Sequence, residues 1–204
     1  MSGRRVLLAS RNAKKLDELR RILARGADGV ELVGLADLPP YPEVPETGLT
    51  FAENALLKAR EGVRRTGLPT VADDSGLTVD ALGGAPGVFS ARWAGRHGDD
   101  AANLQLLLDQ LSDLPDPHRG AAFVCAAALA LPGGEEHVVE GRQAGTLLRA
   151  PRGTGGFGYD PIFVGDGQTR TNAELDPDEK DAISHRGQAF RALATLLPHA
   201  FPVS

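Results

Sequence analysis

Apolar and amphipathic segments alternate along the first third of the chain. The run "RRVLLAS" over residues 4–10 ends in a polar turn, and apolar residues then recur at helical spacing over residues 16–23. A second apolar run covers residues 30–35. This pattern predicts a strand, a tight turn, a helix and a second strand.

A proline-rich stretch separates this part from a second predicted helix. Residues 39–48, "PPYPEVPETG", are too rich in proline for regular structure and predict an exposed loop. Thr50 and Glu53 then have the spacing of a capping box, and Gly67 is a typical helix terminator. The helix between them presents its apolar residues on one face.

Strand-like patterns dominate the middle of the chain. Residues 69–82, "PTVADDSGLTVDAL", predict two short strands around an acidic turn, and residues 99–111 have an amphipathic helical pattern. Apolar runs at residues 121–131, 135–141 and 144–151 are separated by glycine-containing turns. They predict three more strands.

The last third returns to helices. Asp176, Pro177 and Glu179 fit an N-cap, a first helical position and a capping partner, and Ser184 is placed to cap a final helix. Helix and strand blocks mix without strict alternation, so the sequence predicts an α/β fold with a central mixed, elongated sheet flanked by helices. We expect a single domain over residues 1–204, with two lobes and a substrate cleft between them.

Composition and charge narrow the class of protein. With 204 residues, of which 42% are hydrophobic and 24% charged, the chain is that of an ordinary globular protein. The net charge of -5 argues against bulk electrostatic binding of nucleic acid. No apolar run has the length of a membrane span and no signal-peptide pattern opens the chain, so we expect a cytoplasmic protein without nucleic-acid or membrane partners. The single cysteine, Cys125, lies in an apolar run and is expected to be a buried thiol.

The stretch "GTGGFGYDP" at residues 153–161 contains the glycine spacing of a dinucleotide-binding fingerprint. That fingerprint holds phosphates only when a helix follows it. Here a proline and an extended apolar run follow, which disfavours a nicotinamide or flavin enzyme. The glycines are instead expected to let the backbone approach a ligand closely, and Phe157 and Tyr159 offer flat faces for a base.

The segment "SRNAKK" at residues 10–15 is a candidate phosphate pocket where the first strand turns into the first helix. Helix N-terminal amides, the Ser10 hydroxyl, the Asn12 amide and the Lys15 ammonium can all bind phosphate oxygens. The glycines of a Walker A loop are missing. An N-capped helix with surface lysines explains the same residues, and both interpretations stay open.

The adjacent carboxylates of Asp73 and Asp74 in "ADDSG" are a candidate metal site. Two carboxylates so close repel each other unless a cation or a proton lies between them, which suits Mg²⁺ on a phosphate-bearing substrate. Glu46 and Glu53 can supply a further carboxylate only if the fold brings them to Asp74. A solvated acidic turn is the alternative.

His185 and Arg186 in "SHRGQ" present hydrogen-bond donors at a predicted helix start. Arg186 can donate two hydrogen bonds to a keto oxygen or a phosphate. An ordinary helix start is the alternative. Lysines are few, and Lys15, Lys58 and Lys180 all fall beside the candidate segments, where an ammonium suits phosphate binding.

Together these segments resemble the inosine/xanthosine triphosphatase family, pyrophosphatases that act on non-standard purine nucleoside triphosphates. The resemblance rests on "LLASRNAKKLDEL", "ETGLTFAENALLKAR", "ADDSGLTVDALGGAPGVFSARWAG", "GTGGFGYDPIF" and "SHRGQAFRAL", in the order of the family. These segments run nearly end to end, so the match is far more specific than any single motif.

The resemblance implies a dimeric, cytoplasmic, Mg²⁺-dependent enzyme that cleaves the bond between the α and β phosphates of ITP, dITP and XTP. Such an activity would keep these nucleotides out of DNA and RNA. The resemblance also implies that Glu46 and Asp74 hold the metal and that Asp74 accepts a proton from water. The residues implied around the nucleotide are Ser10, Arg11, Asn12, Ala13, Lys14, Lys15, Ser75, Phe157, Gly158, Tyr159, Asp160, Lys180, His185 and Arg186.

The identity of the base follows from hydrogen-bond donors that meet a keto group. An oxygen at C6 can accept from Arg186 or His185, whereas the adenine amino group faces them donor to donor, at about 1–3 kcal/mol per unpaired buried group. One alternative is a pyrophosphatase of similar architecture that acts on pyrimidine or modified nucleotides. Another is a sensor that binds nucleotides without hydrolysis, against which the intact carboxylates Asp73, Asp74 and Glu46 argue.

Overall fold

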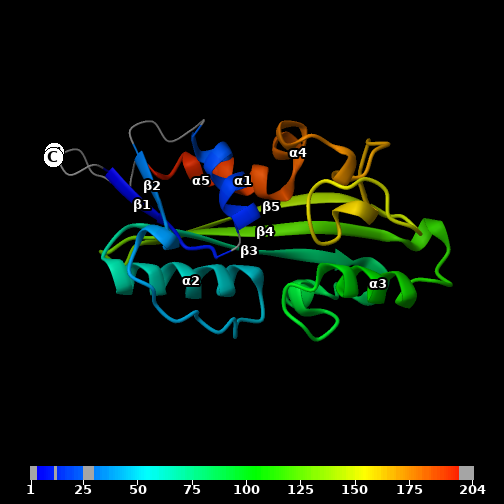
Figure 1. Cartoon of the computed structure of the whole chain (residues 1–204), viewed down its shortest axis with the longest axis horizontal. Coiled ribbons are helices and arrows are strands. Elements are labelled where there is room, and N and C mark those ends of the chain that lie inside the picture. Colours follow the sequence, from blue (N-terminus) through cyan, green and yellow to red (C-terminus); the bar gives the residue numbers. More distant parts are fainter. Residues whose placement is uncertain (1–3, 12, 25–29, 198–204) are drawn as a thin grey trace. The chain divides into compact units, whose positions relative to one another are not determined.

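The computed structural model describes residues 4–11, 13–24 and 30–197, and of residues 13–15 and 24 it describes the backbone only. The described strands form a mixed sheet in the order β2-β1-β3-β4-β5-β6 (Figure 1). The strands are β1 Arg4–Leu8, β2 Val30–Gly34, β3 Thr70–Val79, β4 Gly120–Ala130, β5 Glu136–Leu147 and β6 Phe163–Gly165. The α-helices are α1 Ala13–Ala24, α2 Phe51–Thr66, α3 Asp100–Gln110, α4 Pro177–Ile183 and α5 His185–Ala194. The predicted α/β class, a mixed sheet flanked by helices, is confirmed.

Two compact units divide the chain. The first unit comprises the described residues of Met1–Asp74, Cys125–Gly141 and Arg186–Ser204, and the second unit comprises Ser75–Val124 and Arg142–His185. Strands β3, β4 and β5 contribute residues to both units. The expectation of a single domain over the whole chain stays a prediction.

In the first unit, helices cover both faces of the sheet (Figure 1). Strand β1 pairs in parallel with β2 and with β3. Because successive side chains of a strand point to opposite faces, Val6 and Leu8 pack with α1 and α5, whereas Leu7 packs with α2. The same alternation divides residues of β3 and β4 between the two layers, with Val71 and Cys125 in one and Ala72 and Ala126 in the other.

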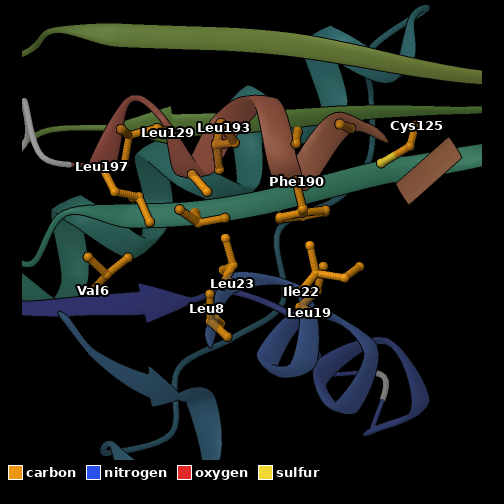
Figure 2. Packing of buried hydrophobic residues seen from close by; sticks show 14 residues of the cluster. Val6, Leu8, Leu19, Ile22, Leu23, Cys125, Leu129, Phe190, Leu193 and Leu197 are labelled. Carbon is orange, nitrogen blue, oxygen red and sulfur yellow. The ribbon is translucent and has the colours of Figure 1, made fainter. Parts of the chain in front are cut away.

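The two layers of the first unit differ in the size of their side chains. Helices α1 and α5 send large apolar side chains toward the strands, namely Leu19, Ile22, Leu23, Phe190 and Leu193, and Leu197 joins them after the end of α5 (Figure 2). The layer under α2 is built mainly from small residues, including Ala55, Ala59, Ala126, Ala128 and Ala130. Cys125 is fully buried on the α1 and α5 side, which confirms its prediction as a core thiol.

In the second unit, α3 packs on the strands through Leu104, Leu107 and Leu111. The guanidinium of Arg119, which is 1% exposed, donates to the carbonyl oxygens of Leu111, Leu147 and Leu148 at 2.6–2.9 Å. These bonds tie the C-terminal end of α3 to the end of β5. No helix in the described part of the chain combines the length and the apolar character needed to cross a membrane.

The helix ends agree with the sequence predictions. Thr50 Oγ1 accepts from the Glu53 amide at 3.1 Å, and the capping box of α2 is complete. Gly67 ends that helix in the left-handed region, at a φ of 68°. Asp176 caps α4 in the same manner.

Two strands that the sequence analysis divided are continuous. Strand β3 runs through the acidic pair Asp73 and Asp74, because each carboxylate has a cationic partner inside the fold. Strand β5 runs through the polar residues between its two apolar runs, where the amides of Gln143 and Asn172 exchange hydrogen bonds at 3.1 Å. Local sequence patterns show where the polar residues are, but they do not show which distant residues pair with them in the fold.

Candidate active site

The acidic pair on β3 is split between the two faces of the sheet in the first unit. Asp73 faces α1 and α5, where the Arg186 Nε donates to Asp73 Oδ2 at 3.5 Å. Asp74 faces α2 and accepts hydrogen bonds from Asn54 and Lys58. Both aspartates are buried. The expectation that one cation lies between these two carboxylates is therefore wrong, because strand geometry gives each its own partner.

Lys58 brings the two predicted metal ligands together. Its Nζ lies 3.0 Å from Glu46 Oε1 and 3.1 Å from Asp74 Oδ1. Burial lowers the pKa of Lys58, but the charges of Asp74, Asp73 and Glu46 outweigh it, and the net pKa is raised above its usual value. Lys58 is therefore an ammonium at neutral pH, held between two carboxylates.

Asn54 is the second donor to Asp74. Its Nδ2 lies 3.2 Å from Asp74 Oδ2. The sequence analysis noted Lys58 only for its place beside a candidate segment and did not single out Asn54. The spacing of Asn54 and Lys58 could have indicated that they act together, because residues four apart on α2 lie on the same face of the helix.

Of the two further carboxylates considered, Glu46 shares the Lys58 ammonium with Asp74. Glu53 instead closes the N-terminus of α2, where its Oε2 accepts from the amides of Leu49 at 2.6 Å and Thr50 at 3.2 Å. Four amides at a helix N-terminus lack partners inside the helix, and this carboxylate satisfies two nearby amides of the preceding loop.

The Glu46 and Asp74 pair fits a magnesium ion. In the described residues, no group of three or more His, Cys, Asp or Glu side chains lies close enough to hold a metal. Mg²⁺ does not require such a group, because it commonly binds one or two carboxylates and takes waters and substrate phosphates as its other ligands. The side chains of Glu46 and Asp74 are 24% and 9% exposed, so the pair keeps some access to solvent.

Arg186 is engaged by two carboxylates of the first unit. Its Nη1 donates to Glu18 Oε2 at 3.1 Å, in addition to the contact of its Nε with Asp73. Arg186 and Glu18 are both buried. The sequence analysis missed Glu18, which it read only as part of an amphipathic helix. A role of Arg186 in reading the base stays a prediction, and any such role uses a guanidinium that these carboxylates already orient.

The predicted phosphate pocket is only partly described. Asn12 lies outside the described residues, as do the side chains of Ala13, Lys14 and Lys15, whose backbone begins α1. Arg11 donates to the Tyr41 carbonyl oxygen, and its guanidinium lies 5.9 Å from the centroid of the Tyr41 ring. Arg11 therefore contacts the proline-rich loop. Binding of phosphate by this segment, including Ser10, stays a prediction.

In the second unit, the glycine-rich segment is a tightly packed loop without a following α-helix. A short 3₁₀ turn, Asp160–Ile162, and strand β6 come next, as the sequence predicted. A Cβ on Gly156 would lie 2.2 Å from Asp160 Oδ2, so only glycine fits there. The backbone at Gly156 thus lies close to another group of the protein itself. A close approach of these glycines to a ligand stays a prediction.

Asp160 and Asp100 hold the backbone of this loop from two sides. Asp160 Oδ2 accepts from the Phe157 amide at 2.8 Å and from Lys180 Nζ at 2.7 Å. Asp100, in the first turn of α3, accepts from the Gly158 amide at 3.0 Å. The two amides that flank the Phe157 side chain are therefore fixed by carboxylates.

The two aromatic residues of the loop have different surroundings. Tyr159 is 3% exposed, its hydroxyl donates to the Ser90 carbonyl at 2.9 Å, and burial raises its pKa. Tyr159 is thus part of the core, and its contact with a base stays a prediction. Phe157 is half-buried, with Lys180 Nζ 5.0 Å from its ring centroid. Phe157 is the aromatic face of this loop that a base could reach.

Two further predicted residues lie in the second unit. Helix α5 begins at His185, as predicted, and this side chain is 2% exposed. Its ring stacks on Phe123, with a centroid distance of 4.8 Å and an interplanar angle of 10°. Ser75 lies half-buried on β3. Contact of His185 or Ser75 with a nucleotide stays a prediction.

Comparison with known proteins identifies the relatives of the chain. The model of the Ham1 family matches residues 6–196. A protein of Mycobacteroides abscessus named dITP/XTP pyrophosphatase is 67% identical over 195 residues, which cover 95% of this chain and 93% of the relative. A protein of the same name from Streptomyces coelicolor is 65% identical, with 95% and 96% coverage. The solved structure of a HAM1 protein from Coxiella burnetii is 45% identical, has a TM-score of 0.85 and covers 96% of this chain and 98% of that one.

Proposed function

The chain belongs to the Ham1 family, and we propose that it hydrolyses dITP, ITP and XTP to the nucleoside monophosphate and pyrophosphate. The observation that carries the proposal is the partly buried cluster of Asp74, Lys58 and Glu46 in a chain similar over nearly its whole length to proteins named for this activity. Removal of these nucleotides would keep them from being incorporated into DNA and RNA.

Hydrolysis at the α phosphorus needs an oriented water, a base that takes its proton, and positive charge near the leaving pyrophosphate. We assign the base to Asp74, whose two oxygens are oriented by Asn54 and Lys58. The Lys58 ammonium places a positive charge 3.1 Å from Asp74 Oδ1, and an ionised carboxylate is the form that accepts a proton. No covalent nucleophile is needed for this reaction.

We further propose that Glu46 and Asp74 hold Mg²⁺. When bound, the ion would supply charge neutralisation to the phosphates. The side chain of Lys58 is 19% exposed and supplies one positive charge to two carboxylates, which leaves the cluster net negative. A net negative cluster of hard oxygen ligands is the environment that this cation prefers.

We assign selection of the base to Phe157 and Arg186, and each assignment has its own support. In the second unit, Phe157 offers a half-buried ring on a loop fixed by two carboxylates. In the first unit, Arg186 is oriented by Glu18 and Asp73. A keto oxygen at C6 accepts hydrogen bonds from such donors and an amino group does not. The homodimer and the cytoplasmic location implied by the family resemblance stay predictions, and light scattering of the purified protein tests the former.

The test is a substrate panel. The purified protein is incubated with Mg²⁺ and, separately, with dITP, ITP, XTP, GTP, ATP and dTTP, and pyrophosphate is measured apart from orthophosphate. We expect pyrophosphate from the first three nucleotides and little product from the others. Orthophosphate in place of pyrophosphate would contradict the bond assigned, and consumption of dTTP alone would favour a pyrimidine pyrophosphatase of similar architecture.

A further inference from the structure

We propose that Asn54 is the positioning residue for Asp74, because its buried amide holds one oxygen of this carboxylate and ties it to the loop that carries Glu46. The inference rests on the function proposed above, in which Asp74 accepts the proton of the attacking water. It assigns a role to a residue that touches neither substrate nor water in that scheme.

The Asn54 side chain has a partner for each of its polar groups. Asn54 is 0% exposed. Its Nδ2 donates to Asp74 Oδ2 at 3.2 Å and to the Gly48 carbonyl oxygen at 3.4 Å, and its Oδ1 accepts from the Gly48 amide at 2.8 Å. An amide carries two donor hydrogens and one acceptor oxygen, so these bonds use all of them. Only one orientation of the amide satisfies this set.

Asn54 and Lys58 each bind a different oxygen of the Asp74 carboxylate. Lys58 Nζ holds Asp74 Oδ1 at 3.1 Å, and Asn54, one turn earlier on α2, holds Oδ2. Lysine is a flexible point charge on a long stem, whereas a buried asparagine is locked by its rotamer and its hydrogen bonds. Lys58 therefore supplies charge, and Asn54 sets the plane of the carboxylate.

The loop lies directly on the amide. A Cβ on Gly48 would come within 2.8 Å of Asn54 Oδ1 and 2.6 Å of Glu53 Cβ, so the backbone is as close as glycine allows. Gly48 is two residues from Glu46, the other carboxylate bound by Lys58. A shift of the amide is thereby transmitted to both ends of the carboxylate pair.

The decisive variant is Asn54→Leu, which keeps the branching at Cγ and the number of side-chain heavy atoms and removes all three hydrogen bonds. The kcat for release of pyrophosphate from dITP should fall about 10- to 100-fold, since small misplacements of a reacting group have effects of that size. The KM should stay within about threefold, because Asn54 is not assigned to substrate binding. Binding of Mn²⁺ to the free protein, followed by electron paramagnetic resonance, should weaken several-fold as Asp74 and Glu46 lose their alignment.

Asn103→Leu is the matched control. Asn103 is also buried, at 1% exposure, and its Oδ1 accepts from the Ala94 amide at 2.7 Å, on helix α3 of the second unit. Asn103→Leu also replaces a buried amide by an apolar side chain, and its kcat and Mn²⁺ affinity should stay near those of the wild type. An unchanged kcat in Asn54→Leu, an equal loss of kcat in the control, or equal Mn²⁺ affinity in all three proteins would overturn the inference.

Gly48→Ala covers the case in which Asn54→Leu does not fold. The added methyl presses on Asn54 Oδ1 from the other side of the same contact, so kcat should fall in the same direction by a smaller factor. A folded Gly48→Ala protein with wild-type kcat would overturn the inference as well. The wild type is assayed first. If it releases no pyrophosphate from dITP, ITP or XTP, the proposed function is contradicted. If it is active, the variants test the role of Asn54 alone.

Discussion

In its described residues, each unit contains a lysine paired with a buried aspartate, and the two pairs differ in charge balance and exposure. In the first unit, Lys58 is shared by Asp74 and Glu46, and its side chain is 19% exposed. In the second unit, Lys180 meets Asp160 at 2.7 Å, with side chains 9% and 3% exposed. One ammonium for two carboxylates leaves negative charge that a cation can still bind, whereas the second pair is already neutral.

The difference in charge balance and exposure indicates that the two lysine–aspartate pairs have different roles. Asp160 also accepts the Phe157 amide, so its pair with Lys180 shapes a loop. Asp74 accepts from the Asn54 and Lys58 side chains and shares the Lys58 ammonium with Glu46, so this pair holds a carboxylate in a cluster that keeps a net negative charge. We therefore expect changes in the first pair to alter turnover and changes in the second to alter stability and substrate affinity.

The largest effect on turnover is expected for Asp74→Asn. The amide keeps the size of the side chain and cannot accept the proton of water, so kcat should fall about a hundredfold or more, as for removal of a general base. The measurement is pyrophosphate release from dITP under saturating Mg²⁺, with circular dichroism as the check on folding. Retained kcat in a folded variant would remove Asp74 from the role of base.

A smaller effect is expected for Lys58→Met on the affinity of the free protein for Mg²⁺. Removal of the ammonium lets Glu46 and Asp74 present their full negative charge, so a cation should bind roughly tenfold more tightly at the effective dielectric constant of a partly buried site. Isothermal titration with Mg²⁺, repeated with Lys180→Met as the control, measures the change. Equal affinity in both variants and the wild type would place the metal away from this pair.

The smallest effect on turnover is expected for Lys180→Met. Loss of the partner of a buried carboxylate costs about 3 kcal/mol in the free energy of unfolding, so the thermal midpoint should drop clearly. At a temperature where the variant is folded, kcat should stay within about threefold and the KM for dITP should rise, because the Phe157 loop is less well held. A large fall in kcat with a normal KM would show that the two pairs are more alike than their surroundings indicate.

The helix boundaries and the class of fold could be predicted from local signals. The capping box of Thr50 and Glu53 and the terminator Gly67 set α2, and the apolar spacing set the face it buries. Such features depend on residues within a few positions of one another, so the sequence alone contains them. The break predicted in β3 failed because the partners of Asp73 and Asp74 come from helices distant in sequence.

The candidate site was only partly predictable for the same reason. Glu46 and Asp74 were identified, but the residues that orient them, Asn54 and Lys58, became evident only when α2 lay against β3. The role of Glu18 became evident only from its hydrogen bond with Arg186, a residue far along the chain. Polar residues on a helix look like a solvated face until the fold shows that they are buried.

By itself, the sequence determined the α/β class, the helix caps, the absence of a helix after the glycines and the resemblance that led to the family. Tertiary structure alone decided that Asp73 and Asp74 face opposite layers, that Tyr159 is core and that Phe157 is not, and that one amide links Asp74 to the loop of Glu46. The physical reason is the distance along the sequence over which each kind of interaction acts. Propensity and periodicity act over a few residues, whereas burial and charge pairing join side chains that only the packed fold brings into contact.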